Sequence, residues 1–363
     1  MGQRYEATHE HFTHPLRSQG QPKENISPFS EKAQQDIKMG SGGRRSTSLR
    51  PASYPRFPST ETNLSSVQDC KSIQEVLRER YDRDGYLFLK GLLPREDILK
   101  CREEYFKLLS PTGVLAPGTS PVDGIFDASK NKNLYPGVGA ATNPGKTMDP
   151  TAATFVDLAV KAHTEPWYAD GLCQHPVLLN FIKEISGWGE NMLPLRRTLL
   201  RNNTPGNNAI GVHYDQIFLR HGDPTAFTAW VPIGDVSLEG GGLIYMEDGD
   251  KVGQDIENAF SAKAAQTGLT DEEAKNGFNQ NMMRTGWLAD GPLEFGHEHK
   301  KRWFVSAYEA GDITLHKPHM IHASTINTDP SNKIRLATDL RYVNSALPHD
   351  KRWMDHYRPD DGL

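Results

Sequence analysis

The stretch Ile210-Gly211-Val212-His213-Tyr214-Asp215 is the part of the sequence from which the fold and the site are best interpreted. Side chains of an extended strand alternate between its two faces, so His213 and Asp215 point to the same side. A histidine and a carboxylate held in this way can bind a metal, and a second histidine from a distant strand would leave other metal positions open. Taken alone, a His-X-Asp sequence arises by chance in many chains, and His213 could be an ordinary core or surface histidine.

Three histidines downstream compete for the place of the third ligand, namely His316, His319 and His322. Arg335 follows them in an apolar strand, and its planar guanidinium is suited to binding a carboxylate. An exposed strand arginine, or a partner for Asp339, would be the plainer interpretation of that residue. The combined spacing of the metal pair, the later histidine and the arginine predicts a redox enzyme.

Short strand-like segments separated by turns surround this stretch from residue 195 onward. They are Leu195–Arg201, Ile210–Asp215, Phe227–Val231, Leu243–Met246, Trp303–Ala307, Ile313–Leu315, Met320–Thr325 and Ile334–Tyr342. Helical patterns come earlier in the chain, and helices followed by a block of strands indicate an α+β fold. We expect the strands to close a double-stranded β-helix, the jelly-roll or cupin-like core, with the N-terminal helices flanking it.

The N-terminal part of the expected domain has clear helix signals. Ser72 and Glu75 form a capping box, Gly85 ends the helix, and Tyr86–Leu89 follows as a buried strand. Further helical patterns cover residues 98–106, 152–162 and 176–185. Residues 111–150 are rich in Gly and Pro, and a stretch of that length without periodicity is typical of a functional loop.

Composition divides the chain into segments. Residues 1–68 are polar and rich in Ser, Pro and Gly, so we expect a disordered tail. A single folded domain is expected over residues 69–345, and residues 346–363 form a C-terminal extension. Residues 250–300 are polar and partly helical, in segments 256–265 and 271–278, which predicts an inserted segment that acts as a lid.

Bulk properties exclude several classes of protein. With a net charge of −5 and a pI near 6.3, neither nucleic acid nor an anionic membrane is favoured as a partner. The three cysteines are scattered, as is typical of a reducing compartment, and no apolar run approaches transmembrane length. We therefore expect a cytoplasmic protein. Arg4 and His11 have the spacing of a peroxisomal address, but Tyr5 and Phe12 flank it poorly.

Several motifs together resemble the phytanoyl-CoA dioxygenase family of iron(II)- and 2-oxoglutarate-dependent oxygenases, over about residues 81–342. Asp84–Leu93 looks like the opening strand of that family, and His213-Tyr214-Asp215 matches its first ligand pair. Trp230 lies where the family often has a tryptophan. His322-Ala323-Ser324 matches the last ligand segment, and Arg335 matches the arginine that grips the cosubstrate. No single one of these motifs is specific.

The resemblance implies Fe(II) held by His213, Asp215 and His322, with His316 as a neighbour that could orient a ligand. It also implies 2-oxoglutarate and O2 as cosubstrates, with ascorbate as the reductant. Because Asp215 is retained, where halogenating relatives have a small residue, hydroxylation of an aliphatic C–H of a small organic substrate is expected, with release of succinate and CO2.

The resemblance assigns the cosubstrate to four residues: Arg335, Ser324, Trp230 and Tyr214. Core packing of aromatic strand residues is the equal alternative for Trp230 and Tyr214. One departure concerns residues 240–249, where the family usually has a Pro-Gly-Ser-His turn and this chain continues as a strand. That departure affects the expected substrate channel and leaves the metal site unaffected.

Two other functions stay open at this point. The same site could catalyse desaturation or oxidative cyclisation in specialised metabolism, since substrate placement decides the outcome. Alternatively the chain could be a catalytically silent jelly-roll binding protein, although its intact ligand set argues against that. The partner is a small molecule in either enzymatic case, and a CoA thioester would need a basic patch such as Lys300-Lys301-Arg302.

Overall fold

The computed structural model describes residues 72–137, 149–266, 270, 287–289 and 291–358. Its helices are α2 (Ile73–Asp84), α3 (Arg95–Leu109), α4 (Pro150–Lys161), α5 (Pro176–Ser186), α6 (Gly249–Gln266) and α8 (Pro292–His299). Its strands are β1 (Tyr86–Leu89), β2 (Met192–Pro194), β3 (Leu199–Asn203), β4 (Phe227–Pro232), β5 (Leu243–Met246), β6 (Trp303–Phe304), β7 (Ile313–His316), β8 (His322–Ser324) and β9 (Arg335–Asn344). The structure thus combines helices with antiparallel sheet.

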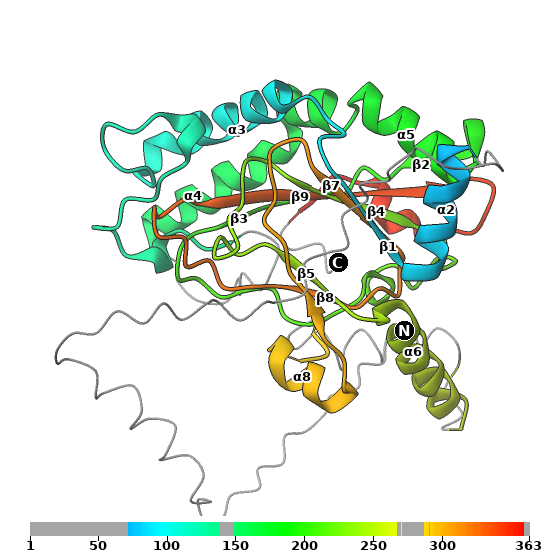
Figure 1. Cartoon of the computed structure of the whole chain (residues 1–363). Helices are drawn as coiled ribbons and strands as arrows, with labels where there is room; N and C mark the ends of the chain where they lie inside the picture. Colours follow the sequence, from blue (N-terminus) through cyan, green and yellow to red (C-terminus); the bar gives the residue numbers. More distant parts are fainter. Residues whose placement is uncertain (1–71, 138–148, 267–269, 271–286, 290, 359–363) are drawn as a thin grey trace, which may run out of the picture. The chain divides into compact units, whose positions relative to one another are not determined.

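Two antiparallel sheets are present among the described residues. The larger has six strands in the order β1-β7-β4-β9-β2, with β3 also pairing with β9. The smaller has the order β6-β5-β8. Helices α3, α4 and α5 lie on one side of the large sheet, and β5 and β8 lie on its other side (Figure 1).

The alternation of side chains along the strands builds both interfaces of the large sheet. In β1, Leu87 packs among the helices, whereas Tyr86 and Phe88 pack toward the small sheet. In β4, Val231 faces the helices and Trp230 faces the small sheet. Both faces of the large sheet are therefore buried, and a site between the two sheets is enclosed.

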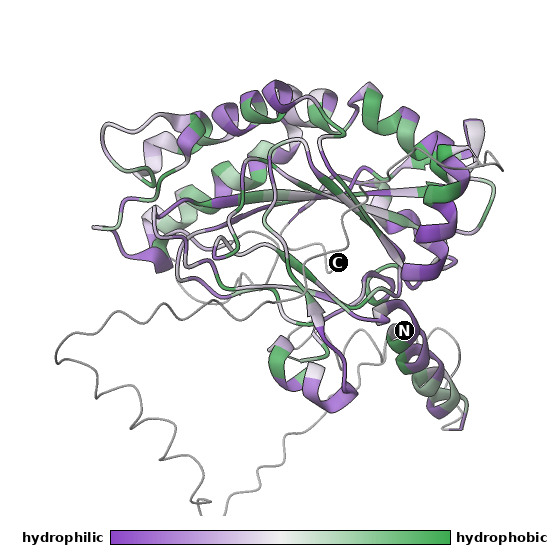
Figure 2. Cartoon of the chain, viewed as in Figure 1, coloured by the Kyte–Doolittle hydropathy of each residue, from purple (hydrophilic) through white to green (hydrophobic). Residues whose placement is uncertain are grey.

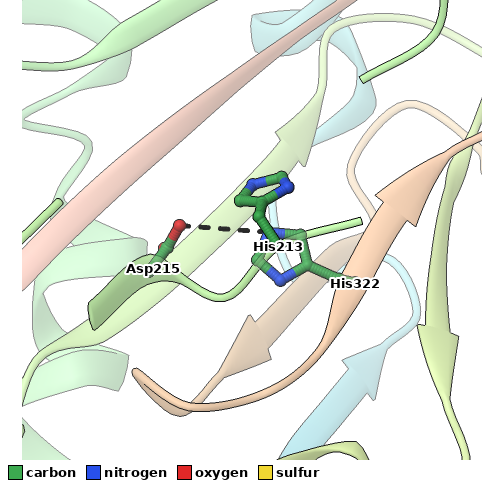
Figure 3. Close-up of side chains that lie close together, drawn as sticks. All are labelled: His213, Asp215 and His322. Carbon is green, nitrogen blue, oxygen red and sulfur yellow. Dashed lines mark ion pairs between the residues drawn. The ribbon is translucent and has the colours of Figure 1, made fainter. Parts of the chain in front are cut away.

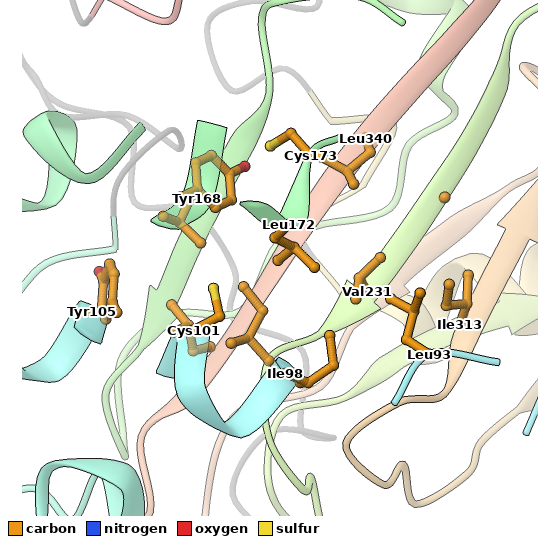
Figure 4. Packing of buried hydrophobic residues seen from close by; sticks show 14 of the residues in the cluster. Leu93, Ile98, Cys101, Tyr105, Tyr168, Leu172, Cys173, Val231, Ile313 and Leu340 are labelled. Carbon is orange, nitrogen blue, oxygen red and sulfur yellow. The ribbon is translucent and has the colours of Figure 1, made fainter. Parts of the chain in front are cut away.

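The helix side carries the larger apolar core. Ile98 and Cys101 of α3 pack near Leu172 and Leu340, as Figure 4 shows. Ile98 is fully buried, and burying such a side chain contributes roughly 1.5–3 kcal/mol. Figure 2 shows the contrast between the hydrophobic α5, which buries Leu178, and the largely hydrophilic α2.

The predicted entry into the domain is confirmed. The Ser72 hydroxyl accepts a hydrogen bond from the Glu75 backbone N–H, and the Glu75 carboxylate accepts one from the Ser72 N–H at 2.7 Å. Gly85 ends α2 with φ of 79°, a left-handed conformation that glycine adopts without a Cβ penalty. Strand β1 and strand β5 have the predicted bounds.

Two predicted strands are wrong in form. The segment 210–215 makes only isolated bridges, from Val212 to Ala289 and from His213 to His322. The segment 195–201 is interrupted because the Arg197 backbone N–H turns to the carbonyl of Trp353 at 3.0 Å. The chain leaves the sheet there in order to pack against the C-terminal residues.

The segment 250–300 joins the rest of the domain through several contacts. Glu257 of α6 accepts hydrogen bonds from the guanidinium of Arg220, at 2.5 and 2.6 Å. The Leu288 N–H donates to the Val212 carbonyl at 2.6 Å. The predicted helix 256–265 lies within α6, whereas the predicted helix 271–278 lies outside the described residues. The expected tail, residues 1–68, lies outside them as well.

Residues 346–358, the described part of the C-terminal extension, pack on the domain. Trp353, in a short 3-10 helix at Lys351–Met354, is buried and contacts Arg341 through a cation–π distance of 4.6 Å. Among the described helices, none is long and apolar enough to cross a bilayer.

Candidate metal centre

The structure brings His213, Asp215 and His322 together. Their candidate ligand atoms all lie within 4.8 Å of one another, and all three residues are buried (Figure 3). His213 lies on an extended segment, Asp215 begins a 3-10 turn at Asp215–Ile217, and His322 begins β8. His213 and His322 stand directly opposite each other, joined by backbone hydrogen bonds of 3.0 and 2.9 Å. The two histidine rings therefore come from a single cross-strand pair.

The backbone fixes the orientation of both imidazole rings. Nδ1 of His213 lies 2.8 Å from the carbonyl oxygen of Gly211, two residues earlier. Nδ1 of His322 lies 2.8 Å from the carbonyl oxygen of Met320, again two residues earlier. A carbonyl can only accept, so Nδ1–H donates in each ring and Nε2 keeps its lone pair. This is the arrangement that prepares a histidine to ligate a metal through Nε2.

The carboxylate of Asp215 is held by three residues of the large sheet. Its Oδ2 accepts hydrogen bonds from Thr228 Oγ1 at 2.6 Å and from His316 Nε2 at 3.3 Å. Its Oδ1 accepts from Arg341 Nη2 at 3.0 Å, and the two side chains form a buried ion pair. The carboxylate is thus fixed in direction before any metal binds.

Protonation states also favour metal binding. Burial alone would raise the pKa of Asp215, but Arg341 and His316 outweigh that effect and bring it well below the ordinary value. Burial lowers the pKa of His213, and burial together with nearby His213 and His316 lowers that of His322. At neutral pH the carboxylate is charged and both rings are neutral, the forms that coordinate metals.

The donor set fits ferrous iron. Two neutral imidazoles and one carboxylate are the ligands of non-haem iron centres that keep open positions for other molecules. Within the described parts of the chain, this is the one cluster of histidine, cysteine and acidic residues close enough to hold a metal ion.

A cavity adjoins this cluster. His213 and His322 line it together with Trp230, Ser324 and Arg335, all of which were predicted for the site. Arg335 is buried, and its Nε donates to the carbonyl of Gly241 at 3.1 Å. Ser324 Oγ accepts from the Ile210 N–H at 2.8 Å, which leaves the hydroxyl proton available to donate. Burial and nearby Arg201 lower the pKa of Arg335 to about 10, so its guanidinium stays charged at neutral pH.

Tyr214, predicted for the cosubstrate pocket, lies elsewhere. Its hydroxyl donates to Glu257 of α6 at 2.7 Å, and its ring lies 5.7 Å from that of His319. Tyr214 is not among the residues that line the cavity. The reason is the alternation along the extended segment, which turns Tyr214 away from its neighbours His213 and Asp215. Tyr214 therefore belongs to the contact between α6 and the metal segment.

The two other candidate histidines have different surroundings. His316 orients Asp215 through Nε2 and faces the Tyr245 hydroxyl with Nδ1 at 2.8 Å, as expected of a residue that positions a ligand. His319 is buried behind Tyr214 and away from the ligand cluster. His322 is the histidine that meets His213 and Asp215.

Four residues at the site were missed from the sequence: Thr228, Arg341, Arg201 and Asp339. The signal for Arg341 and Asp339 was their even spacing from Arg335, which places all three on one face of a strand. No local signal identified Thr228 or Arg201, because their positions depend on strand register.

The phytanoyl-CoA dioxygenase (PhyH) family model matches residues 81–337, which includes the ligand cluster and Arg335. The chain belongs to the phytanoyl-CoA dioxygenase family. It is accordingly a non-haem enzyme that depends on iron and 2-oxoglutarate. A curated relative, 1-deoxypentalenic acid 11-beta-hydroxylase from Streptomyces arenae, is 24% identical over 300 residues, covering 79% of this chain and 87% of the relative.

Similar proteins of known structure include SnoN and EvdO2. The non-haem alpha-ketoglutarate-dependent epimerase SnoN from nogalamycin biosynthesis has 18% identity and a TM-score of 0.42, over 75% of this chain and 82% of the other. EvdO2 from Micromonospora carbonacea var. aurantiaca has 12% identity and a TM-score of 0.43, over 78% of this chain and 98% of the other.

Proposed function

We propose that the protein hydroxylates an aliphatic C–H of a small organic substrate and converts 2-oxoglutarate to succinate and CO2. The observation that carries this proposal is one cavity lined by both histidines of the metal cluster and by Arg335. The family membership and the hydroxylase relative support the same reaction. The presence of Asp215, a complete carboxylate ligand, also favours hydroxylation.

Within this proposal each residue has a defined task. His213, Asp215 and His322 hold Fe(II), which supplies the oxidation of unreactive C–H bonds by O2 when 2-oxoglutarate is bound. Arg335 binds the distal carboxylate of 2-oxoglutarate with its planar fork.

Two residues complete the cosubstrate pocket. Ser324 donates its free hydroxyl proton to the same carboxylate that Arg335 binds. Trp230 forms an apolar wall of the cavity, and its ring centroid lies 4.8 Å from that of Tyr308.

The arrangement of the two sheets supports the expected jelly roll. The large and small sheets pack face to face through Tyr86, Trp230 and Tyr245, and the metal cluster draws on both. A double-sheet jelly roll is built in this way. We assign the described residues of the 250–300 segment as a partial cover of the site, supported by the contacts of Glu257 and Leu288 near the metal segment.

The remaining assignments complete the proposal. Ascorbate serves as reductant. A cytoplasmic location is supported by Cys101 and Cys173, both buried and unpaired.

Formation of succinate tests the proposed function directly. Purified protein with Fe(II), ascorbate and oxygen is expected to release succinate from 2-oxoglutarate. His213→Ala should abolish release, and Arg335→Ala should raise the KM for 2-oxoglutarate by about 10- to 100-fold, since charged hydrogen bonds contribute about 1.5–3 kcal/mol. The exposed His356→Ala and Arg358→Ala are matched controls.

The outcomes separate the rival functions. If the wild-type protein binds neither Fe(II) nor 2-oxoglutarate, the chain is a silent binding protein and the enzymatic proposal fails. If succinate forms but the product carries no added oxygen, the reaction is desaturation or cyclisation at the same site.

A further inference from the structure

One face of β9 carries a row of charged side chains beside the metal cluster. Arg335, Asp339 and Arg341 are spaced by even numbers along the strand and share this face. Arg201 of β3 extends the row, because it stands directly opposite Ala337 on the neighbouring strand. Arg201, Arg335 and Asp339 all line the cavity that His213 and His322 adjoin.

The three arginines of this row have different partners. Arg341 is committed to Asp215, through Nη2 at 3.0 Å and Nε at 3.3 Å. Arg335 donates its Nε to the carbonyl of Gly241, and under the proposed function its terminal nitrogens bind the cosubstrate. Arg201 has a buried Nε without a hydrogen-bond partner, and it forms no ion pair with any residue that the structure describes.

Asp339 does not provide a hydrogen-bond partner for the buried Nε of Arg201. The aspartate raises the pKa of Arg201, but the two side chains form no ion pair within 4.0 Å in the described structure. Burial acts in the opposite direction and lowers that pKa. An arginine nevertheless stays charged in proteins. A buried donor of a charged group that has no partner destabilises the fold. Since Arg201 lies at the wall of a cavity, a ligand bound there could supply the missing partner.

The charges around the cavity agree with the unpaired state of Arg201. Arg201, Arg335 and Arg341 carry three positive charges, and Asp215 and Asp339 carry two negative charges. The neutral histidines add no charge. Iron(II) adds two positive charges and 2-oxoglutarate adds two negative ones, so one positive charge remains. A substrate with a single carboxylate would neutralise it.

Building on the proposed function, we propose that Arg201 binds a carboxylate group of the substrate, which identifies the substrate as a small organic acid. The planar fork of arginine matches a carboxylate with two parallel hydrogen bonds. An acid anchored at Arg201 lies in the cavity that His213 and His322 line, close to the oxidation centre. In the same cavity Arg335 binds 2-oxoglutarate, so each arginine binds a different acid: Arg335 the cosubstrate and Arg201 the substrate.

Binding measurements without turnover test this assignment. The protein is loaded with Mn(II) and 2-oxoglutarate, and monocarboxylates from acetate to decanoate are titrated beside their primary amides by calorimetry. The variants are Arg201→Gln, Arg201→Lys and the control Arg196→Gln, an exposed arginine five positions earlier. Wild type and the control should bind at least one acid about tenfold or more tightly than its amide.

In Arg201→Gln this preference should disappear, and Arg201→Lys should keep part of it because the charge remains. If Arg201→Gln fails to fold, as judged by thermal unfolding, the lysine variant carries the comparison by its weaker preference. Equal binding of acids and amides by the wild type, or no binding by any acid, would overturn the assignment.

The alternative is that Arg201 binds a carboxylate of the cosubstrate, 2-oxoglutarate. A separate titration of 2-oxoglutarate into Mn(II)-loaded Arg201→Gln and Arg335→Gln distinguishes them. The proposal expects a large loss of affinity in Arg335→Gln and a change of less than about twofold in Arg201→Gln. An equal loss in both variants would assign Arg201 to 2-oxoglutarate instead. No 2-oxoglutarate binding by the wild type would be a failure of the proposed function itself.

Discussion

Asp215 is the proposed metal ligand on which the other charges of the cluster depend. Arg341 forms a buried ion pair with it, with both side chains about 2% exposed. A metal ion at the cluster would approach the same carboxylate and bring positive charge of its own. Arg341 and the metal therefore stabilise one negative charge, and removal of either leaves the other as its main partner.

The substitution Arg341→Met tests this relation. Without metal, the variant should lose roughly 3–5 kcal/mol of unfolding free energy, because Asp215 becomes a buried carboxylate without its charged partner. Bound Mn(II) should recover much of that loss. Thermal unfolding with and without Mn(II) measures the effect, and the gap between the two melting temperatures should widen in the variant.

Arg302→Met is the matched control, since Arg302 pairs with Glu247 in a largely exposed position. Its substitution should cost less than about 1 kcal/mol with or without Mn(II). The same loss for Arg341→Met in both metal states would show that Arg341 does not share the carboxylate with the metal.

At the scale of single residues, the sequence was informative where spacing alone decides direction. His213 and Asp215, two residues apart, were predicted to share a face, and the structure brings both to one cluster with His322. The same alternation puts Tyr214 on the opposite side, in agreement with the packing alternative for that residue. Arg201 could not be found, because its place opposite Ala337 depends on the pairing of β3 with β9.

His163 is a buried residue that joins the helices to the large sheet, and its hydrogen bonds require a neutral imidazole. It lies in a short 3-10 helix after α4, where Nδ1–H donates to the carbonyl oxygens of Ala159 and Val160. Its Nε2 accepts the backbone N–H of Leu200 in β3 at 3.1 Å. A proton on Nε2 would face another N–H group. Burial accordingly lowers the pKa of His163 to about 4.

This contact predicts a pH dependence of stability. The unfolded chain binds a proton at His163 below a pH of about 6.5, whereas the folded protein does not until the pH approaches about 4. The contribution of His163 to the free energy of unfolding is thus fully present above pH 6.5 and is lost as the pH falls toward 4. Between pH 7 and pH 5 the loss should be about 2 kcal/mol.

Denaturant unfolding of the wild type and His163→Gln at both pH values checks this contribution. The wild type should lose about 2 kcal/mol more than the variant over this interval. His356→Gln, at an exposed position, should behave as the wild type does. Equal losses in wild type and His163→Gln would contradict a neutral buried histidine.

Elements were predictable where the local pattern and the tertiary environment agree. The Ser72 cap, the Gly85 stop and β1 follow from residues next to one another. Segment 210–215 was a convincing strand by alternation, yet it pairs through single bridges only. Gly211 explains part of this, because a Cβ there would lie 2.5 Å from the Trp287 ring, so the chain passes too close to residues 287–289 for a regular strand.

Across the whole molecule, α6 is linked to the metal segment by one carboxylate. Glu257 accepts hydrogen bonds from Arg220 and from the hydroxyl of Tyr214, which stands between His213 and Asp215. The inserted segment is thereby coupled to the position of His213 and Asp215. This ion pair is largely shielded from water, since the Arg220 and Glu257 side chains are 6% and 15% exposed, and it adds to the apolar packing of α6 through Ile256 and Phe260.

Glu257→Gln should loosen α6 while the rest of the domain stays folded. Loss of the charged hydrogen bonds, about 1.5–3 kcal/mol, should speed tryptic cleavage at Lys251 and Lys263 by about tenfold or more. Mass spectrometry of timed digests measures this rate. Glu298→Gln, an exposed carboxylate on α8, should leave it unchanged. Unaltered cleavage in Glu257→Gln would mean that apolar packing alone holds α6.

The overall organisation was predictable in outline only. Early helices and later strands gave a mixed fold with antiparallel sheet, as the structure has it. The order of strands was not predictable, because β9 pairs with three strands that lie far from it in sequence. The contact of Glu257 with Arg220 could not be predicted from the sequence either, since it joins residues 37 positions apart.

The direct pairing of His213 with His322 has a consequence for the life of the protein in a cell. The two chain segments meet at this bridge and at the hydrogen bonds between Ile210 and Ser324, and iron would fasten them further, because a metal that binds the folded state alone shifts the balance away from opened forms. Opened forms are the ones that cellular proteases degrade. Iron supply would then set the abundance of the enzyme as well as its rate, so that starvation for the metal also clears the idle protein.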